Sequence, residues 1–449
     1  MVQAKRFVFD RYEIDSVNRE LRFYYKIIFE KSRHEELVEK WVLPKGVSLA
    51  KTVALERTVK AIHLAAGISY FKTFLPPEIE TSYSLTEQEA KFWNKVYENG
   101  LGEFCYINQV TKPLAKFVGQ GSSTPVDSQS ANDSCLIGIG GGKDSIVAAE
   151  LLLENGVPLK GFVLSTGDNH GQSEEVGQAI GVQTLGINRY LDTRIIALQK
   201  SLGGLNGHVP ISVMFALSGV LLAALTESAY VAVGNEAASS IPNLHWNGRA
   251  INHQWSKSFE FEELFQNFVH QNISPNITYF SAIRPLSSVG VVKLFSKYPR
   301  YFEKFTSCNR VFRIDPAKRP SGRWCGQCDK CLSSFLLFAP WVSQEQLVKI
   351  FGKNLLDDES LGDGFLALLE LKGHKPLDCV GTPEEIRASL AKLTEQGKFS
   401  GSKLLTLKEL RKLPEVDDID DFLKLSDQHA IPDKLSDKLL PAMQKELDS

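Results

Sequence analysis

The segment from Cys135 to Glu154 reads CLIGIGGGKDSIVAAELLLE, and it decides the fold of the chain. An apolar run, Leu136 to Ile139, enters a glycine-rich turn, and an apolar segment with helical character, Ile146 to Leu153, follows it. This pattern predicts a strand, a phosphate-binding loop and a helix. Glycine lets backbone N–H groups approach an anion closely, and the N-terminus of the following helix adds a favourable dipole. We therefore expect a phosphorylated ligand at this turn.

The spacing of the glycines distinguishes between kinds of phosphate loop. A Walker loop requires G-x-x-x-x-G-K-[ST], but Asp144 follows Lys143 here. A dinucleotide fingerprint requires G-x-G-x-x-G, and Lys143 occupies the place of its third glycine. The turn resembles the pyrophosphate loop (PP-loop) of the N-type ATP pyrophosphatases, usually S-G-G-x-D-S, which split ATP into AMP and pyrophosphate while they adenylate a substrate oxygen. The matching residues are Gly140 in place of the first serine, Gly141, Gly142, Lys143, Asp144 and Ser145. An ordinary glycine-rich turn is the alternative.

Length and charge narrow the class of protein. The 449 residues suffice for two or three domains at roughly 100 to 200 residues each. A net charge of −2 gives no general attraction to nucleic acid, so we expect no nucleic-acid partner. The N-terminal residues lack the apolar segment of a secretory signal, which predicts a cytoplasmic protein. The apolar run from Val209 to Leu225 contains Pro210 and is short for a membrane span, so we expect a buried helix and no membrane association.

Alternation of strands and helices after Cys135 predicts an α/β fold with a parallel sheet and right-handed crossovers. The resemblance of the turn to the PP-loop implies the architecture of the adenine nucleotide alpha hydrolases. Capping boxes are expected at Ser84 with Glu87 and at Thr382 with Glu385. The charged tail beyond Val416 is expected to fray. The predicted regions are a small α+β N-terminal module that begins with a β-hairpin (1–119), a linker rich in Gly, Ser, Pro and Asn (120–134), a PP-loop catalytic domain with a cysteine cluster (135–340) and a helical C-terminal region (341–449).

Polar residues near the ends of predicted strands form a candidate site. Ligands of parallel sheets bind at the carboxyl ends of the strands, so these residues are expected to face the same crevice as the glycine turn. The segment IPNLHWNGRAINHQWSKSFEFEELF follows one strand and is rich in reactive side chains. It is a candidate substrate lid, with an ordinary surface loop as the alternative. The candidates are Ser165, Asn235, Glu236, His253, Lys257 and Arg284.

Four of the seven cysteines form a second signal. Cys325, Cys328 and Cys331 lie in two C-x-x-C steps, and Cys308 precedes them. Four thiolates suit a closed, tetrahedral structural zinc site. An iron–sulfur cluster is the main alternative, followed by redox-active thiols. The remaining cysteines, Cys105, Cys135 and Cys379, are interpreted as thiols of the core.

A wider resemblance covers residues 63 to 385. The loop and the distal cysteines resemble the 7-cyano-7-deazaguanine synthases, but those enzymes are shorter and lack the N-terminal module. The whole chain is more similar to the UDP-N-acetylmuramoyl-L-alanyl-L-glutamate epimerases, the MurL family. The resembling segments are HLAAGISYFKTFLP, NGLGEFCYIN, IGGGKDSIVAAELL, AVGNEAASS, NHQWSKSFEFE, WCGQCDKC and HKPLDCVGTPEE.

The resemblance implies ATP- and Mg²⁺-dependent inversion of the terminal L-glutamate of UDP-MurNAc-L-Ala-L-Glu, a small-molecule substrate of peptidoglycan and cell wall biogenesis. Adenylation removes the carboxylate charge, so that a side-chain base can take the α-proton. In this scheme the glycines, Ser145 and Lys143 bind the leaving pyrophosphate and Asp144 holds magnesium or orients the phosphates. Arg284 or Lys257, and Asn235, bind substrate, and Ser165 contacts the nucleotide. The first candidate for the acid/base is His253, with His208 and Glu236 behind it.

Two other functions remain open on the sequence. A PP-loop enzyme that amidates or thiolates a deazapurine or tRNA predicts those products in place of proton exchange. A non-catalytic ATP-binding regulator predicts nucleotide binding without release of AMP.

Overall fold

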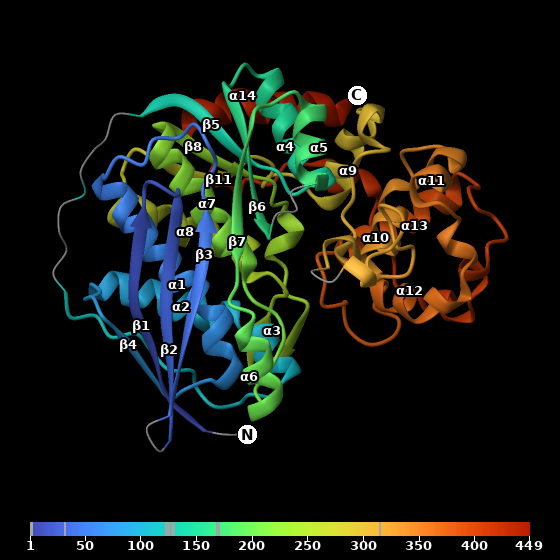
Figure 1. Cartoon of the computed structure of the whole chain (residues 1–449). Coiled ribbons are helices and arrows are strands. Elements are labelled where there is room, and N and C mark those ends of the chain that lie inside the picture. The colour runs from blue at the N-terminus through green and yellow to red at the C-terminus, as the bar shows by residue number, and fades with distance from the viewer. Residues whose placement is uncertain (1–2, 31–32, 122–125, 127–130, 168–170, 314–315) are drawn as a thin grey trace.

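A nine-stranded sheet forms the centre of the molecule, with strand order β11-β8-β5-β6-β7-β3-β2-β1-β4. The computed structural model describes residues 3–30, 33–121, 126, 131–167, 171–313 and 316–449. Helices cover both faces of the sheet, and a helical lobe from the C-terminal part of the chain lies to one side of it (Figure 1). Part of the expected linker, 120–134, lies outside the described residues, and its last residues open β5.

Five strands make up the parallel half of the sheet and confirm the expected α/β class. Across the sheet these strands lie in the order β7-β6-β5-β8-β11, which are the third, second, first, fourth and fifth of the five along the chain. This is a doubly wound arrangement. The direction of winding reverses between β5 and β8, where such sheets open a ligand-binding crevice. The glycine turn follows β5 directly and lies at this crevice. The strands are β5 (Asn132–Gly138), β6 (Leu159–Thr166), β7 (Thr184–Tyr190), β8 (Ser228–Val233) and β11 (Thr278–Ser281).

Two layers of helices pack on the sheet. The expected buried helix is α7, which packs on α1 and the sheet. Within the described residues, no helix is long and apolar enough to cross a bilayer. One layer contains α1 (Val53–Phe74), α2 (Glu87–Gly100), α7 (Ile211–Thr226) and α8 (Phe259–Asn272), and the other contains α4 (Lys143–Glu154), α5 (Gly171–Ile180), α9 (Ser288–Ser296) and α14 (Asp433–Asp448). Shorter helices α3 (Gly102–Ile107) and α6 (Arg194–Leu202) flank the first layer.

The C-terminal tail is ordered, contrary to the expectation that it frays. It ends in α14, which packs against α4 and α9. Its buried side chains repeat every four residues and so lie on one face of the helix: Leu435, Leu439, Met443 and Leu447. The sequence GRWCGQCDKC and the residues after it form a helical lobe with α10 (Asp329–Phe338), α11 (Gln344–Phe351), α12 (Gly362–Leu368) and α13 (Pro383–Glu395).

The N-terminal strands extend the central sheet. The expected hairpin consists of β1 (Ala4–Asp15) and β2 (Glu20–Phe29), but a third strand, β3 (His34–Val42), follows and pairs antiparallel with β7. The short strand β4 (Glu78–Thr81) closes the far edge beside β1. The N-terminal module and the glycine-turn region therefore share one sheet and a common core.

A buried ion pair joins β3 to β7. The guanidinium of Arg189 binds both carboxylate oxygens of Glu39, with Nε–Oε1 and Nη2–Oε2 distances of 2.6 and 2.9 Å. The side chains of Trp41 and Tyr70 also donate hydrogen bonds to Glu39. The pair is almost fully excluded from solvent, so its geometry and its additional hydrogen bonds have to offset the cost of desolvating two charges.

Glu39→Ala is expected to lower the free energy of unfolding by about 3–5 kcal/mol, because it leaves the Arg189 charge buried without a partner. Urea unfolding at neutral pH measures the change. Glu78→Ala is the control, because it removes an exposed ion pair with Arg6 in the same module, worth less than about 1 kcal/mol. Equal effects of the two substitutions would contradict a stabilising role for the buried junction.

Candidate active site

A cavity of about 920 Å³ opens at the carboxyl edge of the parallel strands. Gly140, Gly142 and Asp144 of the glycine turn line it, and Asn235 lines it after the end of β8. The N-terminal module also reaches the cavity through Lys72 of α1. The cavity therefore lies where the strand order predicts a ligand site, and three parts of the chain form its walls.

The glycine turn presents backbone groups rather than capping side chains. Gly142 is the N-cap of α4 and offers no side-chain hydrogen bond to the first turn. Gly141 has a φ of 84°, a conformation that favours glycine. A Cβ atom at Gly140 would meet no other atom within 4 Å, so the position usually held by serine has room for one. The hydroxyl of Ser307 lies beside Gly142 and lines the same cavity. The turn thus combines open N–H groups with a nearby hydroxyl, as anion binding requires.

Lys143 is buried between two carboxylates. Its Nζ pairs with Asp144 and lies 3.3 Å from Oε2 of Glu236, at the end of β8. Burial lowers the pKa of Lys143, but the charges of Asp144 and Glu236 outweigh burial and hold the pKa above its usual range. Ser288 donates a hydrogen bond of 2.8 Å to Oε1 of Glu236. The ammonium is therefore charged near neutral pH and fixed at the glycine turn.

Gly234→Ala is expected to disturb the site, because a Cβ atom there would lie 2.6 Å from the backbone oxygen of Asp144. The added methyl group would push the end of β8 away from the start of α4. This is expected to lower the free energy of unfolding by about 1–3 kcal/mol, as overpacking usually does. Thermal unfolding measures this loss. Gly140→Ala is the matched control in the same crevice, and it is expected to change stability by less than about 0.5 kcal/mol. Similar losses in both variants would contradict the close approach of β8 and α4.

Only the middle of the expected lid segment reaches the cavity. His253, Gln254 and Lys257 line it, whereas His245 and Arg249 belong to the hairpin β9 (Leu244–Trp246) and β10 (Arg249–Ile251) and do not. The segment is thus part hairpin and part cavity wall.

A second pair of charged groups lies at this wall. Nδ1 of His253 is 2.5 Å from Oε2 of Glu103, and the ring of His208 packs beside His253 with centroids 4.8 Å apart. Burial lowers the pKa of His253, but hydrogen bonds to Cys379 and Glu103 outweigh it and raise the pKa to about 10. Burial and the nearby charge of His253 lower the pKa of His208 to about 3. One histidine is therefore cationic and the other neutral near pH 7.

Two predicted ligand contacts need correction. All donor groups of Arg284 are engaged within the protein: Nε and Nη2 bind Glu262, Nη1 donates to Glu236 O and Ser239 Oγ, and Nη2 also donates to Lys257 O. The guanidinium therefore has a structural role and does not line the cavity. Ser165 is buried in β6 and does not line the cavity, whereas Thr166 at the end of the strand does, because successive strand residues face opposite sides.

Many residues of the cavity were not predicted, among them three in the C-terminal part of the chain. Cys379, interpreted as a core thiol, lines the cavity, as do Lys330 and Ser307. Each lies in the C-terminal part of the chain, next to or beyond the cysteine cluster. The segment HKPLDCVGTPEE was noted for its resemblance only, and nothing in its pattern indicates that its thiol meets His253.

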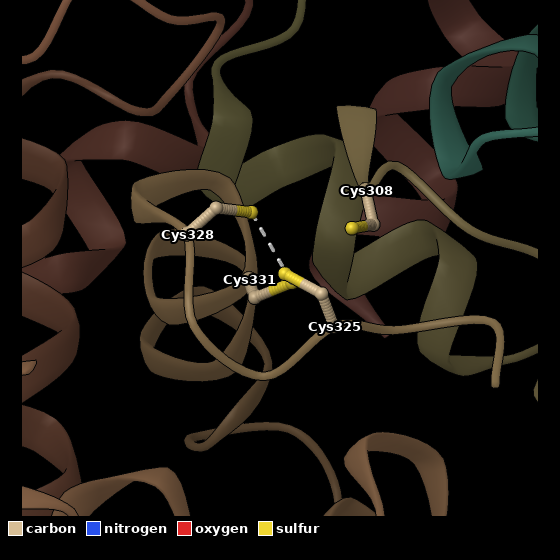
Figure 2. Close-up of side chains that lie close together, drawn as sticks. All are labelled: Cys308, Cys325, Cys328 and Cys331. Atoms are coloured by element: carbon tan, nitrogen blue, oxygen red, sulfur yellow. Dashed lines mark hydrogen bonds between the residues drawn. The ribbon is translucent and has the colours of Figure 1, made fainter. Parts of the chain in front are cut away.

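The four clustered cysteines, Cys308, Cys325, Cys328 and Cys331, have sulfur atoms within 4.8 Å of one another and are free thiols. Figure 2 shows the four side chains pointing toward a common centre. Sulfur–sulfur distances of 3.4 Å (Cys328–Cys331) and 3.7 Å (Cys325–Cys331) are far longer than a disulfide. They are close to the roughly 3.8 Å that a tetrahedral metal with bonds of about 2.3 Å requires. The arrangement is compatible with a closed metal site.

The cysteine cluster also supports the cavity. Thr306, two residues before Cys308, donates its backbone N–H to Gly141 O at 3.0 Å. Lys330 lies between Cys328 and Cys331 at the start of α10 and lines the cavity. The cluster thus connects the segment beside the glycine turn to α10, which carries a cavity lysine.

Sequence comparisons place this architecture among known proteins. Residues 1–282 match the model of the MurL N-terminal domain, and residues 304–420 match that of the MurL C-terminal domain. The chain belongs to the MurL family. The glycine turn and His253 lie in the part of the chain that matches the MurL N-terminal domain, whereas Lys330 and Cys379 lie in the part that matches the MurL C-terminal domain. The cavity is therefore built from both.

Three curated MurL relatives are similar over most of their length, and each is named UDP-N-acetyl-alpha-D-muramoyl-L-alanyl-L-glutamate epimerase. The relative from Xanthomonas oryzae pv. oryzae is 33% identical over 92% of this chain and 93% of its own. The relative from a Micromonospora species is 35% identical over 88% of each chain. The relative from Salinispora tropica is 33% identical over 89% of this chain and 87% of its own.

Proposed function

We propose that this protein is an ATP-dependent epimerase that inverts the terminal L-glutamate of UDP-MurNAc-L-Ala-L-Glu, a step of peptidoglycan precursor synthesis. The observation that carries the proposal is the similarity to three epimerases of this name over nearly the whole chain. The cavity supports it, because a phosphate-binding turn and a set of proton-transferring groups face the same space.

The glycine turn suits adenylation of the substrate carboxylate. Open N–H groups at the start of α4 and the fixed charge of Lys143 would stabilise negative charge on the pyrophosphate that leaves ATP. The carboxylate of Asp144 is partly exposed at the cavity and would hold Mg²⁺ or orient the phosphates. This assignment makes the parallel half of the sheet a PP-loop domain.

Adenylation prepares the α-carbon for inversion. A free carboxylate opposes removal of the neighbouring proton, because the product would place negative charge beside negative charge. Once the carboxylate is adenylated, this charge is gone, and a side-chain base can remove the α-proton. Hydrolysis of the adenylate after reprotonation on the other face releases the D-glutamyl product and AMP. Zn²⁺ in the cysteine cluster would have no open position for substrate, so its part is structural.

Incubation with UDP-MurNAc-L-Ala-L-Glu, ATP and Mg²⁺ in heavy water tests the function. We expect AMP, deuterium at the glutamyl α-carbon and a D-glutamyl product. AMP with an amidated or thiolated product would favour the alternative class of PP-loop enzyme. ATP binding without AMP would favour a regulator, and AMP without deuterium at the α-carbon would also refute the epimerase assignment.

A further inference from the structure

The loop between α12 and α13, residues 369–382, carries Cys379 into the cavity. Asn243, in the part of the chain that matches the MurL N-terminal domain, contacts this loop. Its side-chain Nδ2 donates a hydrogen bond of 2.6 Å to Pro376 O. The backbone N–H of Cys379 donates to Oδ1 of Asp378 at 2.7 Å, and the same oxygen accepts a hydrogen bond from Asn309. The thiol is therefore held in place by contacts from separate parts of the chain.

Cationic groups surround this thiol. Nζ of Lys257 lies 3.8 Å from its sulfur, and a ring nitrogen of His253 lies within 4.8 Å of it. Burial raises the pKa of Cys379, but the charges of Lys257 and Lys330 and the hydrogen bond from His253 outweigh it and bring the pKa to about 6. The cationic groups that act on the thiol are Lys257, Lys330, His253 and Lys375, and the carboxylate of Asp378 also lies within 4.8 Å of the sulfur.

Cys379 also lines two neighbouring spaces at the glycine turn. A smaller recess next to the main cavity is lined by Lys143, Glu236 and Lys257, and Cys379 borders both spaces. A carboxyl group that reacts at the glycine turn has its α-carbon one bond away. A carboxyl group that reacts beside Lys143 and Asp144 would therefore bring its α-carbon toward the recess that Cys379 lines.

We propose that Cys379 removes the α-proton of the substrate glutamate, a role that rests on the proposed epimerase function. The α-carbon–hydrogen bond breaks, and its proton forms an S–H bond with the Cys379 thiolate. The electron pair forms a double bond between the α-carbon and the adenylated carboxyl carbon, with charge moving to the carboxyl oxygen. A proton from solvent water added to the opposite face of the same carbon reverses this flow of electrons, and the Cys379 thiol returns its proton to solvent, so inversion needs no oxidant or reductant.

His253 is a positioning residue in this scheme. Its imidazole is protonated near neutral pH and donates toward Glu103 and Cys379, so it has no lone pair free to accept a carbon-bound proton. Its positive charge and hydrogen bond keep the thiol ionised. Thiolate and imidazolium coexist between about pH 6 and about pH 10, and this range sets the expected window of proton exchange.

Cys379→Ser separates the two chemical steps. With the dipeptide substrate, ATP and Mg²⁺ in heavy water, α-deuterium incorporation is expected to fall by about 100-fold or more. Release of AMP is expected to fall by less than tenfold, because adenylation does not require loss of the α-proton. Cys105→Ser is the matched control, since Cys105 is a buried thiol of α3 outside the cavity. Exchange within tenfold of the unmodified protein in Cys379→Ser would overturn the assignment. Absence of exchange in the unmodified protein would instead refute the proposed function.

Alkylation provides a second readout that does not depend on substrate. The iodoacetamide reaction at Cys379, followed by peptide mass spectrometry, is expected to reach its full rate above about pH 7 and to decline as the pH falls through about 6. His253→Gln removes the imidazolium, so the midpoint of this curve is expected to move to higher pH. A rate that still rises through the range of an ordinary thiol, near pH 8.5, in the unmodified protein would overturn the proposal.

Discussion

The Asp144→Asn variant is expected to lose ATP-dependent release of AMP by about 100-fold or more while keeping its fold. Asp144 lies in the first turn of α4, faces the cavity and forms an ion pair with Lys143. Asparagine has nearly the same shape, so the substitution removes the charge that is proposed to hold Mg²⁺ and to orient Lys143. Product chromatography with the dipeptide substrate, ATP and Mg²⁺ measures AMP, and circular dichroism verifies the fold.

Asp133→Asn is the matched control for this prediction. Asp133 belongs to the same region, at the start of β5, but its carboxylate is exposed and pairs with Lys434 of α14. Its substitution is expected to leave AMP release unchanged. AMP release within tenfold of the unmodified protein in Asp144→Asn would remove this carboxylate from the mechanism.

Cys328→Ser is expected to have the largest effect on stability. Binding of structural zinc contributes roughly 10–16 kcal/mol in small peptides, whereas a whole domain has only about 5–15 kcal/mol of net stability. Loss of one of four thiolates is therefore expected to release the metal and to unfold the helical lobe around α10. Elemental analysis of the purified protein measures bound metal, and thermal unfolding and limited proteolysis measure the stability of the lobe.

Cys105→Ser is also the control for Cys328→Ser, because it changes a thiol that lies outside the cysteine cluster. It is expected to keep the metal and the unfolding temperature of the lobe. A Cys328→Ser protein that is metal-free yet as stable as the unmodified protein would show that the cluster does not support the fold. Detection of iron and sulfide in the purified protein would show that the four cysteines hold an iron–sulfur cluster and not zinc.

Features with a local signal were predictable from the sequence. The glycine turn, the apolar helix α7 and the cysteine cluster each depend on residues close together in the chain, and each forms where the spacing indicates. The capping box of α13 is formed by Thr382 and Glu385 as expected. The box of α2 is formed by Thr86 and Glu89 and not by Ser84 and Glu87. Both pairs have the required spacing, and only the start of the packed helix decides between them.

Features that depend on distant segments were not predictable. The pairing of β3 with β7 adds the N-terminal strands to the central sheet, and no local pattern specifies the partner of an extra strand. Arg284 follows a strand end as an anion-binding arginine would, but Glu262 of α8 neutralises it from elsewhere in the chain. Cys379 is a single cysteine in a loop, and its environment comes from Lys257 and His253, which lie far away in sequence.

Because the α12–α13 loop carries Cys379 late in the chain, the parts that line the cavity are synthesised at different times. During synthesis the ribosome releases the glycine turn, and then the strands of the central sheet, well before it releases Cys379 and the helix that follows. Domains generally fold as units with the N-terminal one first. The glycine turn can therefore form on a nascent chain that still lacks Cys379. The cavity is complete only once the helical lobe has been made and has packed beside the sheet.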